Sequence, residues 1–125
     1  MANPLFTLGL VAKQLGDGDS ARTYLRESLA INRKIGDRGG IAYCLEAFAS
    51  LAATSTDRDR AARLWGFATR LRKEIGAALS PKEQEELDRE QALVRSALGE
   101  EGFFQARSES GDMALEQAIE LALSA

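Results

Sequence analysis

Apolar side chains recur along the chain at helical spacing, in two blocks that match each other when the sequence is shifted by 40 residues. Counted from Ala21 or from Ala61, apolar residues recur at i, i+3, i+4, i+10 and i+14, which is one stripe of an α-helix. The matched positions are Leu5, Leu8, Gly9, Ala12, Asp19, Ala21, Tyr24, Leu25, Ile31, Ile35 and Gly36 with Leu45, Phe48, Ala49, Ala52, Asp59, Ala61, Leu64, Trp65, Leu71, Ile75 and Gly76. This pattern predicts an internal repeat.

Turn signals divide each block into two helices. The first helix is expected over roughly residues 3–15, because the Gly16-Asp17-Gly18-Asp19 run interrupts it. Asp19 is predicted to cap the next helix by accepting a backbone N–H, and Gly36 is predicted to end that helix in the left-handed conformation. The second block is expected to form helices over residues 40–54 and from about residue 58 to Gly76.

Beyond the repeat, start and stop signals predict three more helices. Ser80-Pro81-Lys82-Glu83 combines an N-cap serine, a proline in the first turn and a capping-box glutamate, and Gly99 ends the helix that they open. A short helix is expected over residues 100–109, and Asp112 is predicted to open the last one. The apolar positions available for packing are Leu87, Val94, Leu98, Phe103, Phe104, Ala106, Leu115, Ala118, Ile119, Ala122 and Leu123.

Composition agrees with an all-α fold of about seven helices. The chain contains 21 Ala and 17 Leu but only 2 Val, 5 Ile and 5 Thr, so residues that favour helices far outnumber those that favour strands. A length of 125 residues favours one domain. We therefore expect a single helical domain over residues 1–125, with one repeat at 3–36, a second at 40–76 and a C-terminal helical cap at 80–125.

The side-chain chemistry favours binding over catalysis. The chain has no His and a single Cys, Cys44, which excludes Ser-His-Asp and Cys-His catalysis and an internal disulfide. The Gly16-Asp17-Gly18-Asp19 run lacks the other oxygen ligands of a calcium loop, and no phosphate-binding GxxxxGK[ST] sequence is present. We expect no enzyme activity, no cofactor and no metal. With no recognisable signal peptide or membrane-spanning stretch, a cytoplasmic protein without membrane contact is expected.

Charge is divided unevenly along the chain. Residues 1–79 carry 12 basic and 8 acidic groups, whereas residues 80–125 carry 4 and 11. The acidic cap is interpreted as the polar outer face that keeps repeat ends soluble, and the less favoured alternative is a surface that repels nucleic acid and attracts a basic partner. Glu83, Glu85, Glu86 and Glu90 are interpreted as a solvated helix face. The net charge of +3 over residues 57–75 is expected to pair with that face rather than with nucleic acid.

The hairpin pattern resembles the tetratricopeptide repeat, whose first helix carries large apolar residues around a Leu-Gly pair and whose second helix alternates small and aromatic residues. The positions that carry this resemblance are Leu5, Leu8, Gly9, Ala12, Ala21, Leu25 and Ser28, and in the second copy Leu45, Phe48, Ala49, Ala52, Ala61, Trp65 and Ala68. The 40-residue period exceeds the usual ~34 residues, and Arg33 and Lys73 stand near the usual closing proline. Both departures, with the runs at residues 80–81, 97–103 and 115–119, resemble the C-terminal repeat region of bacterial transcriptional regulators that contain a sensor ATPase.

The resemblance implies an α-solenoid whose first helices line a concave, protein-binding face. The residues it places there are Asn3, Phe6, Leu10, Lys13, Tyr43, Glu46 and Ser50. Phe6 and Tyr43 lie off the packing stripe, which fits a contact surface and equally fits an ordinary amphipathic wall. The expected function is a non-catalytic protein-interaction or effector-sensing scaffold whose partner is a protein, a peptide or another module of a regulator. The alternative is a structural role in homodimerisation through the exposed first repeat.

Overall fold

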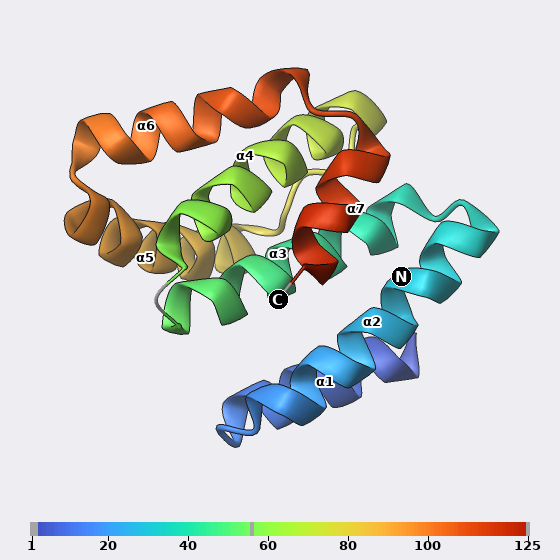
Figure 1. The fold of residues 1–125 in the computed structure, drawn as a ribbon. Coiled ribbons are helices and arrows are strands. Elements are labelled where there is room, and N and C mark those ends of the chain that lie inside the picture. Colours follow the sequence, from blue (N-terminus) through green and yellow to red (C-terminus); the bar gives the residue numbers. More distant parts are fainter. Residues whose placement is uncertain (1–2, 56, 125) are drawn as a thin grey trace.

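The computed structural model describes residues 3–55 and 57–124, and all regular secondary structure in these ranges is helical (Figure 1). The elements are α1 (Pro4–Gln14), α2 (Gly18–Ile35), α3 (Arg38–Thr54), α4 (Arg58–Ile75), α5 (Pro81–Leu98), α6 (Glu100–Glu109), the 3-10 turn η1 (Ser110–Asp112) and α7 (Leu115–Leu123). The predicted all-α class with seven α-helices is confirmed for the described residues. None of these helices is both long and apolar enough to cross a membrane.

Three aspartates spaced 20 residues apart cap three successive helices. The carboxylates of Asp17, Asp37 and Asp57 accept the backbone N–H three residues further on, at the starts of α2, α3 and α4. The prediction that Asp19 caps α2 is therefore wrong by one half-turn, because Asp19 lies inside the first turn. Gly36 and Gly76 end α2 and α4 with φ of 72° and 67°, the left-handed conformation expected of them.

α1 with α2, and α3 with α4, form two hairpins packed side by side through α2 and α3. Within the first hairpin, a Cβ added at Gly9 would lie 3.0 Å from the Leu25 side chain, so this glycine allows α1 and α2 to approach closely. Ala49, its counterpart in the second hairpin, is fully buried. Small residues thus occupy equivalent repeat positions where the helices of each hairpin pack together.

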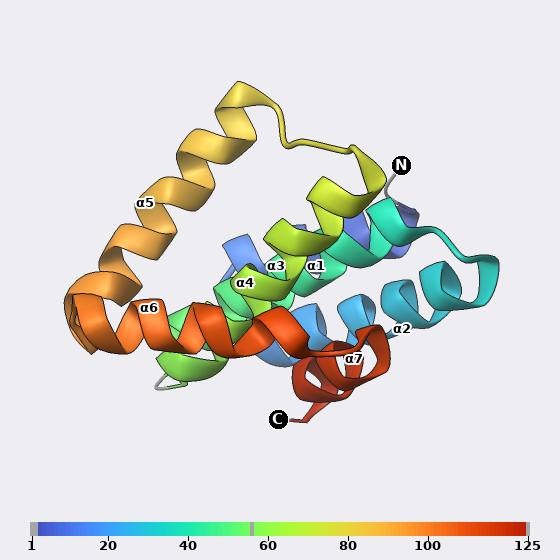
Figure 2. The ribbon, with the colours of Figure 1, turned by 90° about the horizontal axis from the view of Figure 1, so that it is seen from above.

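The C-terminal helices cover the second hairpin from two sides, as Figure 2 shows, with α5 on one side of α3 and α4 and with α6 and α7 on the other. α6 approaches α4 at Gly66, where an added Cβ would lie 2.3 Å from the Ser110 Oγ and 2.6 Å from the Arg107 carbonyl oxygen. α7 begins at Leu115 rather than at Asp112, whose η1 turn precedes it.

α7 also reaches the first hairpin. It is tied to α2 by an ion pair between Arg33 and Glu116 and by a 3.1 Å hydrogen bond from the Arg26 guanidinium to the Leu123 carbonyl oxygen. Ala118, Ile119 and Ala122 form its buried face, as predicted. The last helix therefore bridges the two hairpins.

Several residues that the repeat stripe assigns to the core are exposed in the first hairpin. Leu8 is 45% exposed and Ile31 is 41% exposed, whereas their counterparts Phe48 and Leu71 are 4% and 3% exposed. The difference arises because the second hairpin lies between other helices and the first hairpin has a neighbour on one side only. We call Leu8, Val11, Leu15, Ile31 and Ile35, all exposed, the N-terminal apolar face. Phe104, expected to be available for packing, is also exposed.

Candidate functional site

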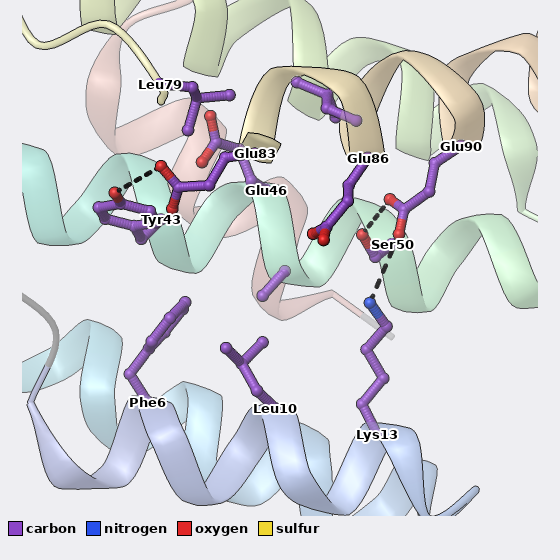
Figure 3. Close-up of a pocket in the computed structure, with 12 residues that line it drawn as sticks. Phe6, Leu10, Lys13, Tyr43, Glu46, Ser50, Leu79, Glu83, Glu86 and Glu90 are labelled. Carbon is purple, nitrogen blue, oxygen red and sulfur yellow. Dashed lines mark hydrogen bonds and ion pairs between the residues drawn. The ribbon is translucent and has the colours of Figure 1, made fainter. Parts of the chain in front are cut away.

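A groove with a cavity volume of about 180 Å³ lies where α1, α3 and α5 converge (Figure 3). Its twelve lining residues are Phe6, Leu10, Lys13, Tyr43, Glu46, Ala47, Ser50, Leu79, Glu83, Glu86, Leu87 and Glu90. The structure thus brings together six of the seven residues that the tetratricopeptide resemblance places on a protein-binding face, namely Phe6, Leu10, Lys13, Tyr43, Glu46 and Ser50. Asn3 does not line it and instead donates a 3.3 Å hydrogen bond to the Asn32 side chain.

The apolar part of the groove combines aromatic and aliphatic side chains. The rings of Phe6 and Tyr43 meet edge to face with 5.7 Å between their centroids, and Phe6 is only 7% exposed. The Arg72 guanidinium lies 4.4 Å from the centre of the Tyr43 ring. These two aromatic residues therefore support the fold as well as the groove, while half-buried Leu10 and Leu87 offer more accessible apolar surface.

Beneath the groove, Glu46 is held by a buried ion pair. Both of its carboxylate oxygens accept hydrogen bonds from the Arg72 guanidinium, at 2.7 and 2.8 Å. Burial raises the pKa of Glu46 above its ordinary value, and the hydrogen bonds and charge of Arg72 act in the opposite direction. Arg72 also donates a 2.9 Å hydrogen bond to the Ala77 carbonyl oxygen, so the same guanidinium fixes the connection between α4 and α5.

The third wall of the groove, formed by α5, carries three glutamates in different environments. Glu83 accepts hydrogen bonds from the Ser80 backbone N–H at 3.0 Å and from the Tyr43 hydroxyl at 3.4 Å. The bond from Ser80 is the main reason that the pKa of Glu83 is lowered, so this carboxylate is ionised at neutral pH.

Glu90 and Glu86 differ in their partners. Glu90 accepts a 2.5 Å hydrogen bond from the Ser50 hydroxyl and lies 3.6 Å from the Lys13 ammonium. Glu86 makes no hydrogen bond or ion pair within the described residues. Its carboxylate points into the space above Leu10 in Figure 3. Glu86 is therefore the groove carboxylate most open to a ligand.

The contribution of α5 was not anticipated from the sequence. Glu83, Glu86, Leu87 and Glu90 are spaced i, i+3, i+4 and i+7, so the helical period places them on one face, but a face so rich in carboxylates is expected to be solvated. The expected pairing of α4 arginines with α5 is also wrong for the described residues. The observed ion pairs are Arg60 with Asp57, Arg63 with Asp59 and Glu109, Arg70 with Glu74, and Arg72 with Glu46.

No group of three His, Cys, Asp or Glu residues suited to a metal ion occurs in residues 3–55 and 57–124. The Cys44 thiol is fully buried beside the Ser28 hydroxyl and the Asn32 amide, and burial raises its pKa, so it is a poor nucleophile.

Comparison with protein-family models, curated proteins and solved structures found no match. The groove combines apolar side chains with four carboxylates and one ammonium group.

Proposed function

We propose that this protein is a non-catalytic binding module that holds a segment of another polypeptide in the groove between α1, α3 and α5. The observation that carries this proposal is the convergence of side chains from both repeats on one apolar surface with a polar rim. A volume of about 180 Å³ suits one or two side chains, since pockets for small molecules typically hold about 300–1,000 Å³.

The proposal extends to the family context. We propose that the two hairpins are tetratricopeptide-like repeats of an α-solenoid, in which the first helices line the concave binding face. In that setting the chain serves as the C-terminal repeat region of a bacterial cytoplasmic regulator, and its partner is a protein, a peptide or another module of that regulator. The internal repeat supports the family context, and the buried Cys44 thiol, which forms no disulfide, fits a cytoplasmic protein.

Leu10→Ser is expected to weaken binding in the groove by about 1 kcal/mol or more, because it removes apolar surface that lines the groove. The measurement uses peptides selected from a random 12-residue library on the intact protein, with dissociation constants read by fluorescence anisotropy. Leu93→Ser is the matched control, since Leu93 is 74% exposed on α5 and does not line the groove. If the selected peptides bind the Leu10 variant as tightly as the parent protein, the groove is not their site.

The N-terminal apolar face supports a second function, self-association. Its members Leu8 and Val11 correspond to Phe48 and Leu51 of the second hairpin, which are buried beside Arg22 of α2 and Ala122 of α7. The first hairpin therefore exposes apolar residues at positions that other helices cover in the second hairpin. If two copies met through this face about a two-fold axis, each copy would cover the N-terminal apolar face of the other.

Val11→Asp is expected to abolish such a dimer, because it places a charge within the apolar contact. Light scattering after size-exclusion chromatography, at tens of micromolar protein, measures the mass directly. Leu93→Asp should leave the mass unchanged, since Leu93 lies on α5 outside the N-terminal apolar face. A parent protein that is monomeric at this concentration would contradict self-association as its main role.

A further inference from the structure

We infer that the segment bound in the groove is basic. A large apolar side chain of this segment occupies the apolar part of the groove, and flanking Lys or Arg side chains meet the carboxylates of α5. This inference rests on the proposed groove function and adds the chemical class of the partner. It follows from the charges that line the groove and from the absence of internal partners for part of that charge among the described residues.

The lining residues carry four carboxylates and a single ammonium group. Arg72 of α4 neutralises Glu46, and the Lys13 ammonium lies 3.6 Å from the Glu90 carboxylate. Glu83 and Glu86 have no ion-pair partner in the described part of the chain. The groove therefore keeps about two uncompensated negative charges beside an apolar floor.

The rest of the fold leaves this charge in place. Four of the five arginines of α4, which the sequence suggests as partners of α5, instead form ion pairs with carboxylates of α3, α4, α6 and the turn before α4. Arg72 acts on Glu83 only at longer range, where its charge helps to lower the Glu83 pKa. A cleft lined by one sign of charge with apolar walls concentrates its electric field, which attracts cations and repels acidic segments. Lys13 is the one cation among the lining residues, so the groove is poorly suited to a carboxylate ligand.

The spacing of the two carboxylates without an ion-pair partner sets the spacing of the partner's cations. Glu83 and Glu86 are three residues apart on α5, which corresponds to about 4.5 Å along the helix. The Glu86 carboxylate is directed toward Leu10 of α1. Basic side chains three or four residues apart in a bound helix match this distance most closely.

The test is the composition of peptides selected from a random 12-residue library on the parent protein. Enrichment of Lys and Arg around a large apolar residue is the expected result. For such peptides, Glu86→Gln should weaken binding about two- to fivefold, and Glu86→Lys should weaken it about tenfold or more, because like charges then face each other. Glu101→Lys is the control, since Glu101 is an exposed carboxylate of α6 outside the groove.

The outcomes separate this inference from the function on which it rests. Peptides that lose binding in Leu10→Ser but are acidic or neutral, or that are indifferent to Glu86→Lys, would overturn the basic partner and leave the groove function standing. Peptides whose binding depends on neither Leu10 nor Glu86 would overturn both, as would a library that yields no binder. Equal weakening by Glu86→Lys and Glu101→Lys would show a non-specific effect of net charge and would also overturn the inference.

Discussion

Replacing Trp65 with alanine is expected to lower the free energy of unfolding by about 3–5 kcal/mol. Trp65 is 1% exposed and is the largest fully buried side chain in the described structure, on the α4 face that the repeat pattern assigns to the core. Its removal loses the transfer free energy of the indole and leaves a cavity that the surrounding helices fill only in part. Denaturant unfolding followed by circular dichroism measures the change.

Two controls make this result specific. Leu93→Ala removes a side chain that is 74% exposed and should change the unfolding free energy by about 0.5 kcal/mol or less. Trp65→Phe keeps an aromatic ring and removes an indole N–H that has no hydrogen-bond partner among residues 3–55 and 57–124, so it should cost less than Trp65→Ala. A Trp65→Ala loss no larger than that of Leu93→Ala, or readily quenched Trp65 fluorescence in the parent protein, would contradict the core position.

The helices that the sequence predicts most accurately are those whose boundaries depend on local chemistry. Gly36 and Gly76 end α2 and α4 because the left-handed conformation suits residues without a Cβ. The Ser80–Glu83 capping box opens α5 as predicted, because both of its hydrogen bonds lie within one turn. Asp17 rather than Asp19 caps α2, which shows that local signals locate a helix start to within about two residues.

Contacts between helices distant in the sequence were harder to predict. Gly66 carries no turn signal inside α4, and its role appears only once α6 packs against it. For the groove, the repeat aligns α1 with α3 and so groups six of their seven lining residues, because equivalent positions of the two hairpins face the same side. α5 has no counterpart in that alignment. Its position is set by contacts across the fold, among them the hydrogen bonds of Arg72 to Ala77 and of Ser50 to Glu90, which no pattern in the sequence reveals.

Arg72→Ala is the second substitution with a large expected effect, a loss of about 3–5 kcal/mol in the free energy of unfolding. The side chains of Arg72 and Glu46 are 8% and 14% exposed, so removing the guanidinium leaves a buried carboxylate without its counter-charge. The change also removes the hydrogen bond to the Ala77 carbonyl oxygen and the cation contact with the Tyr43 ring. Arg89→Ala, which breaks an exposed ion pair with Glu85, should cost about 0.5 kcal/mol or less.

A double variant distinguishes a buried-charge penalty from lost packing. If the penalty dominates, Arg72→Met combined with Glu46→Leu should recover much of the stability that Arg72→Ala loses, because apolar replacement of both partners leaves no unpaired charge. The Ala77 contact stays broken in that double variant, so amide hydrogen exchange over residues 77–90 should remain faster than in the parent protein. Parent-like exchange there would show that other contacts hold α5, and Arg72 would then stabilise the fold without positioning the third wall of the groove.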